Sequence, residues 1–171
     1  RHTSTDGVAT DLKAGLKVLA GEIVDATFMN VAELDKFLAE TLQQAKRDDV
    51  LYSLHLKATM MKVSDPILFG HVVKAFFADV FAKYGNDLAA AGLSANDGLG
   101  SILAGLANIA NGTEIASAFD AALAAGPRLS YVNSDKGITN LHVPSDVIVD
   151  ASIPALIRNG GKLWGKDGRS E

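Results

Sequence analysis

The sequence contains no cysteine among its 171 residues. That absence excludes disulfide bonds, thiolate metal sites and thiol catalysis, and it fits a reducing, cytoplasmic location. No apolar run approaches the roughly 20 residues that a membrane-spanning helix needs, so we expect no membrane partner. The polar first residues also show no basic-then-apolar leader.

A nucleic-acid-binding surface is not expected either. The net charge is −4, and no cluster of basic residues is interleaved with aromatic residues. The sequence also has no glycine-rich phosphate loop, no nucleophile elbow and no histidine pair with metal-ligand spacing. With 48% hydrophobic and 21% charged residues, the composition is that of a globular domain. The five arginines are scattered, so this chain alone lacks the arginine cluster that a tricarboxylate needs.

Strands alternating with helices predict an α/β fold, with a mixed α+β fold as the alternative, built as a layered sheet with flanking helices. In the first part, "LKVLAGEIVDATFMN" (16–30) predicts a strand hairpin around Ala20-Gly21. Asn30 is expected to cap a helix over 31–46. "DVLYSLHL" (49–56) predicts a buried strand.

Asp65 and Pro66 then predict the start of a long amphipathic helix that continues to Tyr84. Residues 86–126 are alanine-rich and broken by "SANDG" and "NG", which predicts two or three short helices as a helical insertion in the middle of the fold. Strands are expected at 127–133 and 141–143, with a polar loop between them.

Trp164, in the turn-rich tail, is expected to be a packing anchor. No internal repeat and no linker divides the sequence. We therefore expect residues 1–171 to form a single domain or subdomain, with 86–126 as a helical, variable region inside it.

The stretch "LHLKATMMKVSDP" (54–66) places lysines around an apolar pair where a strand leads into a helix. In open α/β sheets this edge binds ligands, and the helix N-terminus favours an anion. Lys57, among Leu56 and two methionines, would be partly desolvated, which lowers a lysine pKa and eases proton transfer. The alternative is that Lys57 and Lys62 extend along an apolar edge to reach water.

The stretch "NSDKGITNLHVPSDVIVDAS" (133–152) is rich in oxygen donors. With Ser145 as an N-cap, Asp146 and Asp150 would lie four residues apart on one helical face, where carboxylates suit a hard cation. Pro154 clashes with the carbonyl group four residues before it, so we expect a kink or a restart of the helix near Ser152. The alternative makes Asp146 a partner of the helix dipole and Asp150 a solvated surface acid.

The strings "SLHLKATMMKVSDPILFGHVVKAFFADVF" and "NSDKGITNLHVPSDVIVDASIPALIRNGGKLWG" closely resemble the monomeric, NADP-dependent isocitrate dehydrogenase family. The segment "LKVLAGEIVDAT" resembles it too, so the resemblance covers nearly the whole chain. Family members are several times longer. The resemblance therefore implies that the chain is an internal fragment of their large central domain, completed by the remaining segments of the parent chain as partners.

The resemblance implies oxidation of isocitrate to 2-oxoglutarate and carbon dioxide, with NADP as cofactor and Mg²⁺ or Mn²⁺ bound to the substrate. The family's catalytic, substrate-binding lysine falls in "HLKATMM" and corresponds to Lys57. One metal-ligating aspartate falls in "SDVIVDAS" and corresponds to Asp150. The family's other substrate, metal and NADP-binding residues have no counterpart here, so we expect the isolated chain to be inactive. Two alternatives remain: a stand-alone module that binds small anions, and a structural domain without catalysis.

Overall fold

A computed structural model describes residues 1–25, 27–56, 63–144, 149–158 and 160–171; the side chains at 149–152 lie outside this description. The mixed helix-and-strand class is confirmed. The helices are α1 (Val31–Asp48), α2 (Ser64–Phe76), α3 (Ala78–Ala90), α4 (Gly98–Gly105), α5 (Gly112–Ala125) and α6 (Val149–Arg158), with 3₁₀ turns η1 (Ala95–Asp97) and η2 (Leu106–Asn108). The strands are β1 (His2–Thr3), β2 (Ala9–Thr10), β3 (Tyr131–Asn133) and β4 (Ile138–Thr139).

The first predicted helix is confirmed. The side chain of Asn30 accepts hydrogen bonds from the backbone N–H groups of Ala32 and Glu33, so two of the donors that a helix start leaves unpaired are satisfied. The helix ends at Asp49, whose left-handed backbone (φ 51°) stops further propagation. Leu38 and Leu42 are the buried positions of its apolar stripe, and α1 packs mainly on α2.

The predicted helix from Pro66 to Tyr84 is present, but it is bent into α2 and α3 at Phe77. Phe77 has φ −105° and ψ 35°, which interrupts the regular helix. Its ring is 1% exposed and packs edge-on against Phe119 of α5, with ring centroids 5.0 Å apart. The apolar spacing is the same in a straight helix and in a bent pair, so this tertiary contact could not be anticipated from the sequence.

The expected cap of α2 is not formed. The helix begins at Ser64, and Val63 occupies the N-cap position without a side-chain hydrogen bond. Asp65 therefore lies inside the first turn, where it is only 6% exposed, instead of capping the helix.

The alanine-rich region is helical, as predicted, and it belongs to the core. η1, α4, η2 and α5 all fall within it, and η1 packs on α2 while α5 packs on α3. The largest fully buried side chains of the described residues come both from this region and from its flanks: Phe69, Val73, Phe77, Leu88, Leu99, Ile102, Ile115, Phe119 and Leu141.

Strand structure is sparser than predicted. The described residues contain two antiparallel pairs, β1 with β2 and β3 with β4, instead of one layered sheet. Of the predicted buried strand at 49–56, residues 51–56 are half-buried, and Tyr52 makes an isolated parallel bridge with Leu129. The strand predicted at 141–143 is also wrong, because β4 forms two residues earlier, inside the expected loop.

The hairpin predicted at 16–30 is absent from the described residues. A turn does form at Ala20-Gly21, where the Glu22 N–H donates to the Leu19 carbonyl at 3.1 Å. Gly21 is left-handed (φ 78°) at the third turn position and Ala20 is not, the arrangement of a type II turn. Such turns splay the flanking strands, whereas two-residue hairpins favour the mirror-image types.

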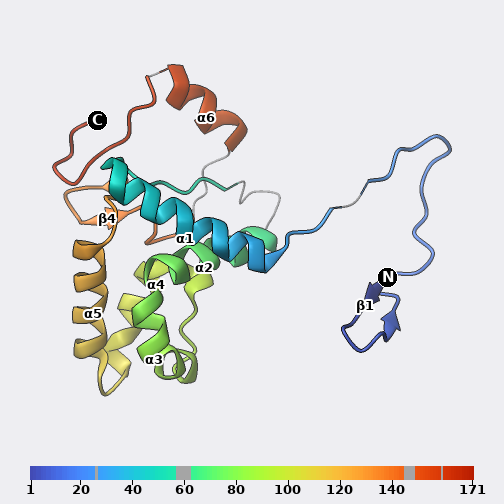
Figure 1. The fold of residues 1–171 in the computed structure, drawn as a ribbon, viewed down its shortest axis with the longest axis horizontal. Coiled ribbons are helices and arrows are strands. Elements are labelled where there is room, and N and C mark those ends of the chain that lie inside the picture. The colour runs from blue at the N-terminus through green and yellow to red at the C-terminus, as the bar shows by residue number, and fades with distance from the viewer. Residues whose placement is uncertain (26, 57–62, 145–148, 159) are drawn as a thin grey trace.

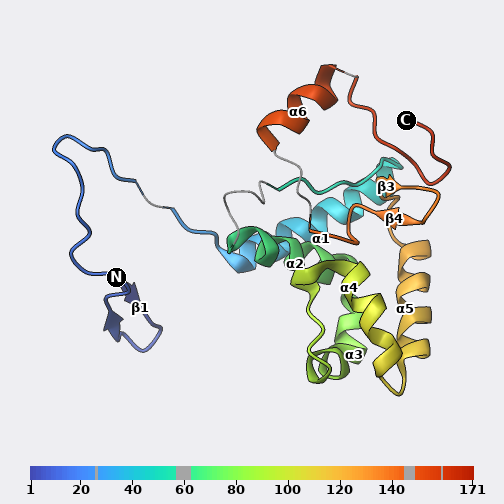
Figure 2. The ribbon, with the colours of Figure 1, turned by 180° about the vertical axis from the view of Figure 1, so that it is seen from behind.

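The N-terminal arm, defined here as residues 11–25 and 27–30, reaches away from the helices toward the small β1–β2 hairpin (Figures 1 and 2). At the other end, α6 and the C-terminal segment lie beyond α1 (Figure 1). The helix α6 runs through Ser152 and contains Pro154, so a restart near Ser152 is wrong, and the alternative, a kink there, stays a prediction. Trp164 is 59% exposed, so its side chain is not the predicted packing anchor. Within the described ranges, no helix is long and apolar enough to cross a membrane.

Candidate functional site

The two predicted site residues, Lys57 and Asp150, have side chains that lie outside the described part of the structure. Lys57, with Lys62, lies in the 57–62 gap. Asp146 lies in the 145–148 gap, together with the predicted cap Ser145. Asp150 is the second residue of α6, but its side chain is outside the description. Whether Lys57 and Asp150 converge therefore stays a prediction, and the structure describes the framework on which both segments are built.

Backbone hydrogen bonds join two stretches that are far apart in sequence, one around Tyr52 and one at 128–140. The Tyr52 N–H donates to the Arg128 carbonyl at 2.7 Å, and the Ser130 N–H donates back to Tyr52 at 3.0 Å. The Asn140 N–H donates to the Ser130 carbonyl at 2.9 Å. These bonds place residues 52, 128–130 and 140 side by side.

The side chain of Asn140 completes this connection. It is 6% exposed, and its Oδ1 accepts the backbone N–H of Leu54 at 2.5 Å, across 86 positions of sequence. Leu54 is three residues before Lys57, so this bond fixes the last described backbone before the 57–62 gap. Asn140 is a framework residue that the sequence interpretation listed only as one of several oxygen donors.

The segment that leads to α6 is fixed by the start of α4. The N–H groups of Leu99 and Gly100 donate to the carbonyls of Leu141 and His142 at 3.0 and 2.8 Å. Because these carbonyls satisfy a helix N-terminus, the segment pairs with the helix start and not with a strand. Gly98 makes the approach close enough, since a Cβ there would lie 2.4 Å from the His142 oxygen.

His142 lies in this segment, three residues before the 145–148 gap. Its Nδ1 accepts the Thr139 N–H at 3.0 Å, so the neutral ring carries its proton on Nε2. Burial lowers the pKa of His142, which favours this neutral form. The result is one imidazole with a defined tautomer at the end of the described segment.

Two buried polar atoms flank the 57–62 gap. His55 Nδ1 and Asp65 Oδ2 are buried and have no hydrogen-bond partner among the described residues. His55 is held through its other nitrogen, which lies 3.0 Å from Ser53 Oγ, and burial lowers its pKa. An unpaired buried polar atom costs about 1–3 kcal/mol of stability. Each of these two atoms, one before and one after the 57–62 gap in sequence, can therefore take part in a further hydrogen bond.

The described residues do not form a complete metal site. No group of three or more His, Asp or Glu side chains in the described ranges is arranged to hold a cation. A carboxylate such as Asp150 has the oxygen chemistry that Mg²⁺ and Mn²⁺ prefer, and Mg²⁺ commonly takes only one or two protein carboxylates. The chemistry of this chain therefore fits a divalent cation to which the chain contributes one carboxylate ligand.

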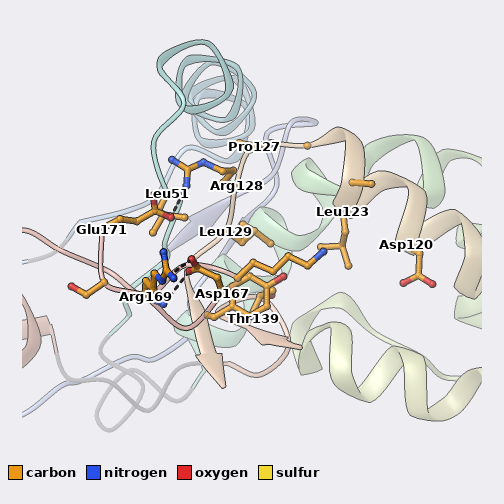
Figure 3. Close-up of a pocket in the computed structure, with 15 residues that line it drawn as sticks. Leu51, Asp120, Leu123, Pro127, Arg128, Leu129, Thr139, Asp167, Arg169 and Glu171 are labelled. Atoms are coloured by element: carbon orange, nitrogen blue, oxygen red, sulfur yellow. Dashed lines mark hydrogen bonds and ion pairs between the residues drawn. The ribbon is translucent and has the colours of Figure 1, made fainter. Parts of the chain in front are cut away.

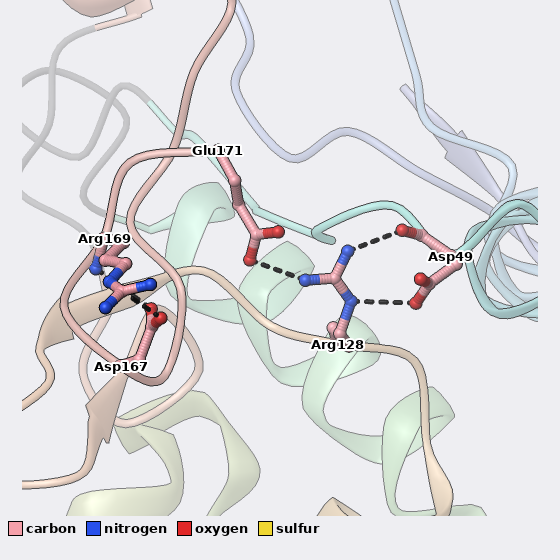
Figure 4. A network of polar contacts seen from close by, with 5 residues as sticks. All are labelled: Asp49, Arg128, Asp167, Arg169 and Glu171. Carbon is pink, nitrogen blue, oxygen red and sulfur yellow. Dashed lines mark hydrogen bonds and ion pairs between the residues drawn. The ribbon is translucent and has the colours of Figure 1, made fainter.

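A cleft of about 820 Å³ lies between the C-terminal loop, α5 and the segment around Arg128 (Figure 3). The two arginines that line it are engaged within the fold (Figure 4). The Arg128 guanidinium contacts Asp49 Oδ1 at 2.8 Å and Glu171 Oε1 at 2.5 Å, and Arg169 lies 3.6 Å from Asp167. Glu171 first, and Asp49 second, raise the pKa of Arg128. These pairs help hold the C-terminal loop in place, so neither arginine is a free cation for an anionic ligand.

Comparison with known proteins decides the family. The sequence matches the family model described as "Monomeric isocitrate dehydrogenase" over residues 1–171. The chain belongs to the monomeric isocitrate dehydrogenase family. Its curated relatives are named isocitrate dehydrogenase [NADP]: those of Corynebacterium glutamicum and Corynebacterium efficiens are 57% and 56% identical over 171 residues, and that of Azotobacter vinelandii is 51% identical over 166.

The chain is much shorter than these isocitrate dehydrogenases. The alignments cover 100%, 100% and 96% of the chain but 23%, 24% and 22% of the C. glutamicum, C. efficiens and A. vinelandii relatives. The sequence resemblance to this family is thereby confirmed, and the match includes both predicted site segments. The framework residues Asn140 and Gly98 were not assigned a role from the sequence, because their contacts join segments that no local pattern connects.

Proposed function

We propose that the chain acts as part of an NADP-dependent isocitrate dehydrogenase that oxidises isocitrate to 2-oxoglutarate and carbon dioxide. The observation that carries this proposal is the family match over residues 1–171, which takes in the segments of Lys57 and Asp150 together. The bond between Leu54 and Asn140 supports it, because it joins the backbone that leads to Lys57 to the segment that leads to α6.

Lys57 is proposed to bind a substrate carboxylate and to handle the proton of the reacting hydroxyl. If Leu56 and the two methionines shield Lys57 from water, its attraction for a carboxylate would be stronger and it would lose its proton more easily. The unpaired Asp65 oxygen and the neutral His55 lie on either side of this segment, so the surroundings are polar without adding a competing cation.

Asp150 is proposed to supply one carboxylate ligand to Mg²⁺ or Mn²⁺. When bound, such a cation acts as a Lewis acid that stabilises negative charge developing on substrate oxygens. Asp150 lies in α6, where Pro154 has no N–H to offer the Asp150 carbonyl. The residue is thus carried on a regular element while its backbone oxygen lacks that helical partner.

The remaining substrate, metal and NADP contacts are proposed to come from polypeptide outside these residues. Residues 1–171 would form a single domain or subdomain, with the helical region 86–126 as part of its core. On this proposal the isolated chain shows no turnover when isocitrate, Mg²⁺ and NADP⁺ are added. Turnover by the isolated chain would contradict it.

The test is a substitution in a family-length protein that contains this segment. Lys57→Met should reduce turnover by about 100- to 10,000-fold, the range for loss of a general acid–base group. The circular dichroism spectrum and the thermal midpoint should stay unchanged. Asp150→Asn should also reduce turnover and raise the Mn²⁺ concentration needed for half-maximal rate. Lys62→Met is the matched control and should retain activity.

The two alternatives give different results in the same experiment. A structural domain predicts that Lys57→Met lowers the thermal midpoint, with activity lost only through unfolding. A stand-alone anion-binding module predicts that calorimetry detects isocitrate binding to the isolated chain in the absence of any other polypeptide. Either result would replace the proposed function.

A further inference from the structure

The N-terminal arm exposes an unusual amount of apolar surface. Ile23 is 95% exposed, Phe28 85% and Leu19 79%. Leu12, Leu16, Val18, Val24 and Met29 are each at least half exposed as well. In a folded protein, a run of exposed apolar side chains of this length marks a surface that is normally covered.

The arm has the composition of strands. "LKVL" (16–19) and "EIVDATF" (22–28) flank the Ala20-Gly21 turn and include β-branched Val18, Ile23 and Val24, residues enriched in strands. Yet no residue of the arm is in a strand within the described ranges. The sequence therefore carries a preference for strand pairing that the body of this chain does not satisfy.

The turn explains why the two segments do not pair with each other. In a two-residue hairpin, Leu19 and Glu22 would exchange both backbone hydrogen bonds. Here the Glu22 N–H donates to the Leu19 carbonyl, but the Leu19 N–H donates to the Glu22 side chain at 2.6 Å. Together with left-handed Gly21, this arrangement turns the chain while letting its two sides diverge, as the path of the arm in Figures 1 and 2 shows.

We infer that the two sides of the arm, 16–19 and 22–29, add as strands to a β-sheet built by polypeptide outside residues 1–171 in family-length proteins. The family match begins at residue 1, so the arm is present in relatives of which this chain spans about a quarter. The family is described as monomeric, so a second copy is not the expected cover. Strand addition pairs backbone groups with a neighbouring strand and buries alternate side chains on each face.

This inference depends on the family assignment and not on Lys57 or Asp150, so enzymatic activity is not its readout. The measurement is amide hydrogen exchange of the arm in the 171-residue chain and in a family-length protein. In the short chain, the amides of residues 16–18, 23 and 24 should exchange at nearly unprotected rates. In the family-length protein they should exchange at least about 100-fold more slowly, as for amides of a paired strand.

A substitution separates strand pairing from general shielding. Val24→Pro removes a backbone donor, so in the family-length protein it should lower the thermal midpoint and speed exchange of the neighbouring arm amides at least about tenfold. In the 171-residue chain the same substitution should leave the helical unfolding transition unchanged. Val24→Thr, which keeps the N–H and the β-branch, is the matched control and should have little effect in either protein.

Fast exchange of the arm in the family-length protein would overturn the inference. So would protection of the arm in the short chain accompanied by a dimeric mass in sedimentation, because the cover would then be a second copy. Slow exchange in the family-length protein that is insensitive to Val24→Pro would also overturn it, since the arm would be buried without strand pairing.

Discussion

The helical body, defined as residues 31–48 and 64–125, and the N-terminal arm are both rich in apolar residues, but they use them in opposite ways. Phe119, in α5, has no exposed surface, whereas Phe28, in the arm, is 85% exposed. The two residues are chemically identical. The comparison shows that burial is decided by whether a segment finds its packing partner within the same stretch of chain.

The physical difference lies in where the backbone hydrogen bonds are made. A helix satisfies its own N–H and C=O groups locally, so α1 to α5 need only apolar stripes to pack against one another. A strand needs a neighbouring strand for the same groups. The helices of the body therefore make their backbone hydrogen bonds within these residues, whereas the arm has no strand within the described ranges.

The largest effect is expected from a matched pair of phenylalanine substitutions in the two regions. Phe119→Ala should lower the free energy of unfolding of the chain by about 3–5 kcal/mol, because it leaves a cavity beside Phe77. Phe28→Ala should change it by less than about 0.5 kcal/mol, as for an exposed position. Urea denaturation followed by circular dichroism measures both. Equal losses would show that the arm packs on the helical body.

The second effect concerns the junction beside the proposed site. Asn140→Ala should cost about 1–3 kcal/mol, because it leaves the Leu54 N–H without its acceptor in a part-buried position. Asn133 is the matched control, since its Oδ1 accepts the Lys136 N–H in an exposed turn. Asn133→Ala should therefore cost clearly less in the same denaturation experiment. A loss at Asn133 as large as at Asn140 would contradict the framework role of Asn140.

The third effect tests the border between arm and body. Asn30→Ala should lower the free energy of unfolding by about 1 kcal/mol, because two N–H groups at the start of α1 lose their acceptor. Asn30→Ser retains a capping oxygen and should recover most of the loss. If Asn30→Ala has no effect in thermal or urea unfolding, α1 does not depend on this cap.

The smallest effect is a pH dependence from the buried histidines. Burial lowers the pKa of His55 and of His142 in the folded chain. Below the ordinary histidine pKa of about 6.5, the unfolded state therefore binds more protons than the folded state. Stability from these groups is complete above that pH and falls as the pH is lowered toward the depressed folded values.

Urea unfolding between pH 7.5 and pH 5 measures this dependence. The double variant His55→Asn and His142→Asn should show a flatter pH profile, and the asparagine Oδ1 at position 142 can still accept the Thr139 N–H. An unchanged slope in the double variant would assign the pH dependence to other groups.

The sequence predicted best where structure is local. Asn30 and the apolar spacing after it were enough to place α1, and "SANDG" and "NG" marked the breaks between the short helices of the alanine-rich region. Predictions failed where distant residues decide the outcome. The bend at Phe77 depends on a contact with Phe119. The absence of a strand at 141–143 depends on the start of α4, where the Leu99 N–H donates to the Leu141 carbonyl across 42 positions of sequence.

The candidate site shows the same limit. The two sequence segments that resemble the family are enough to nominate Lys57 and Asp150, because each residue lies within one continuous motif. The contacts that hold their segments, such as the one from Leu54 to Asn140, join residues with no local relation and could not be read from spacing. The failed hairpin at Ala20-Gly21 is a further case, since one left-handed glycine and one glutamate side chain redirect the strands.

The convergence of Lys57 and Asp150 is tested most directly by anomalous diffraction from a family-length protein crystallised with Mn²⁺ and isocitrate. We predict an Asp150 carboxylate oxygen about 2.1 Å from the cation and Lys57 Nζ in hydrogen-bond contact with the same substrate, within about 10 Å of that carboxylate. A cation held without Asp150, or Lys57 on a different face of the fold, would contradict the proposed site.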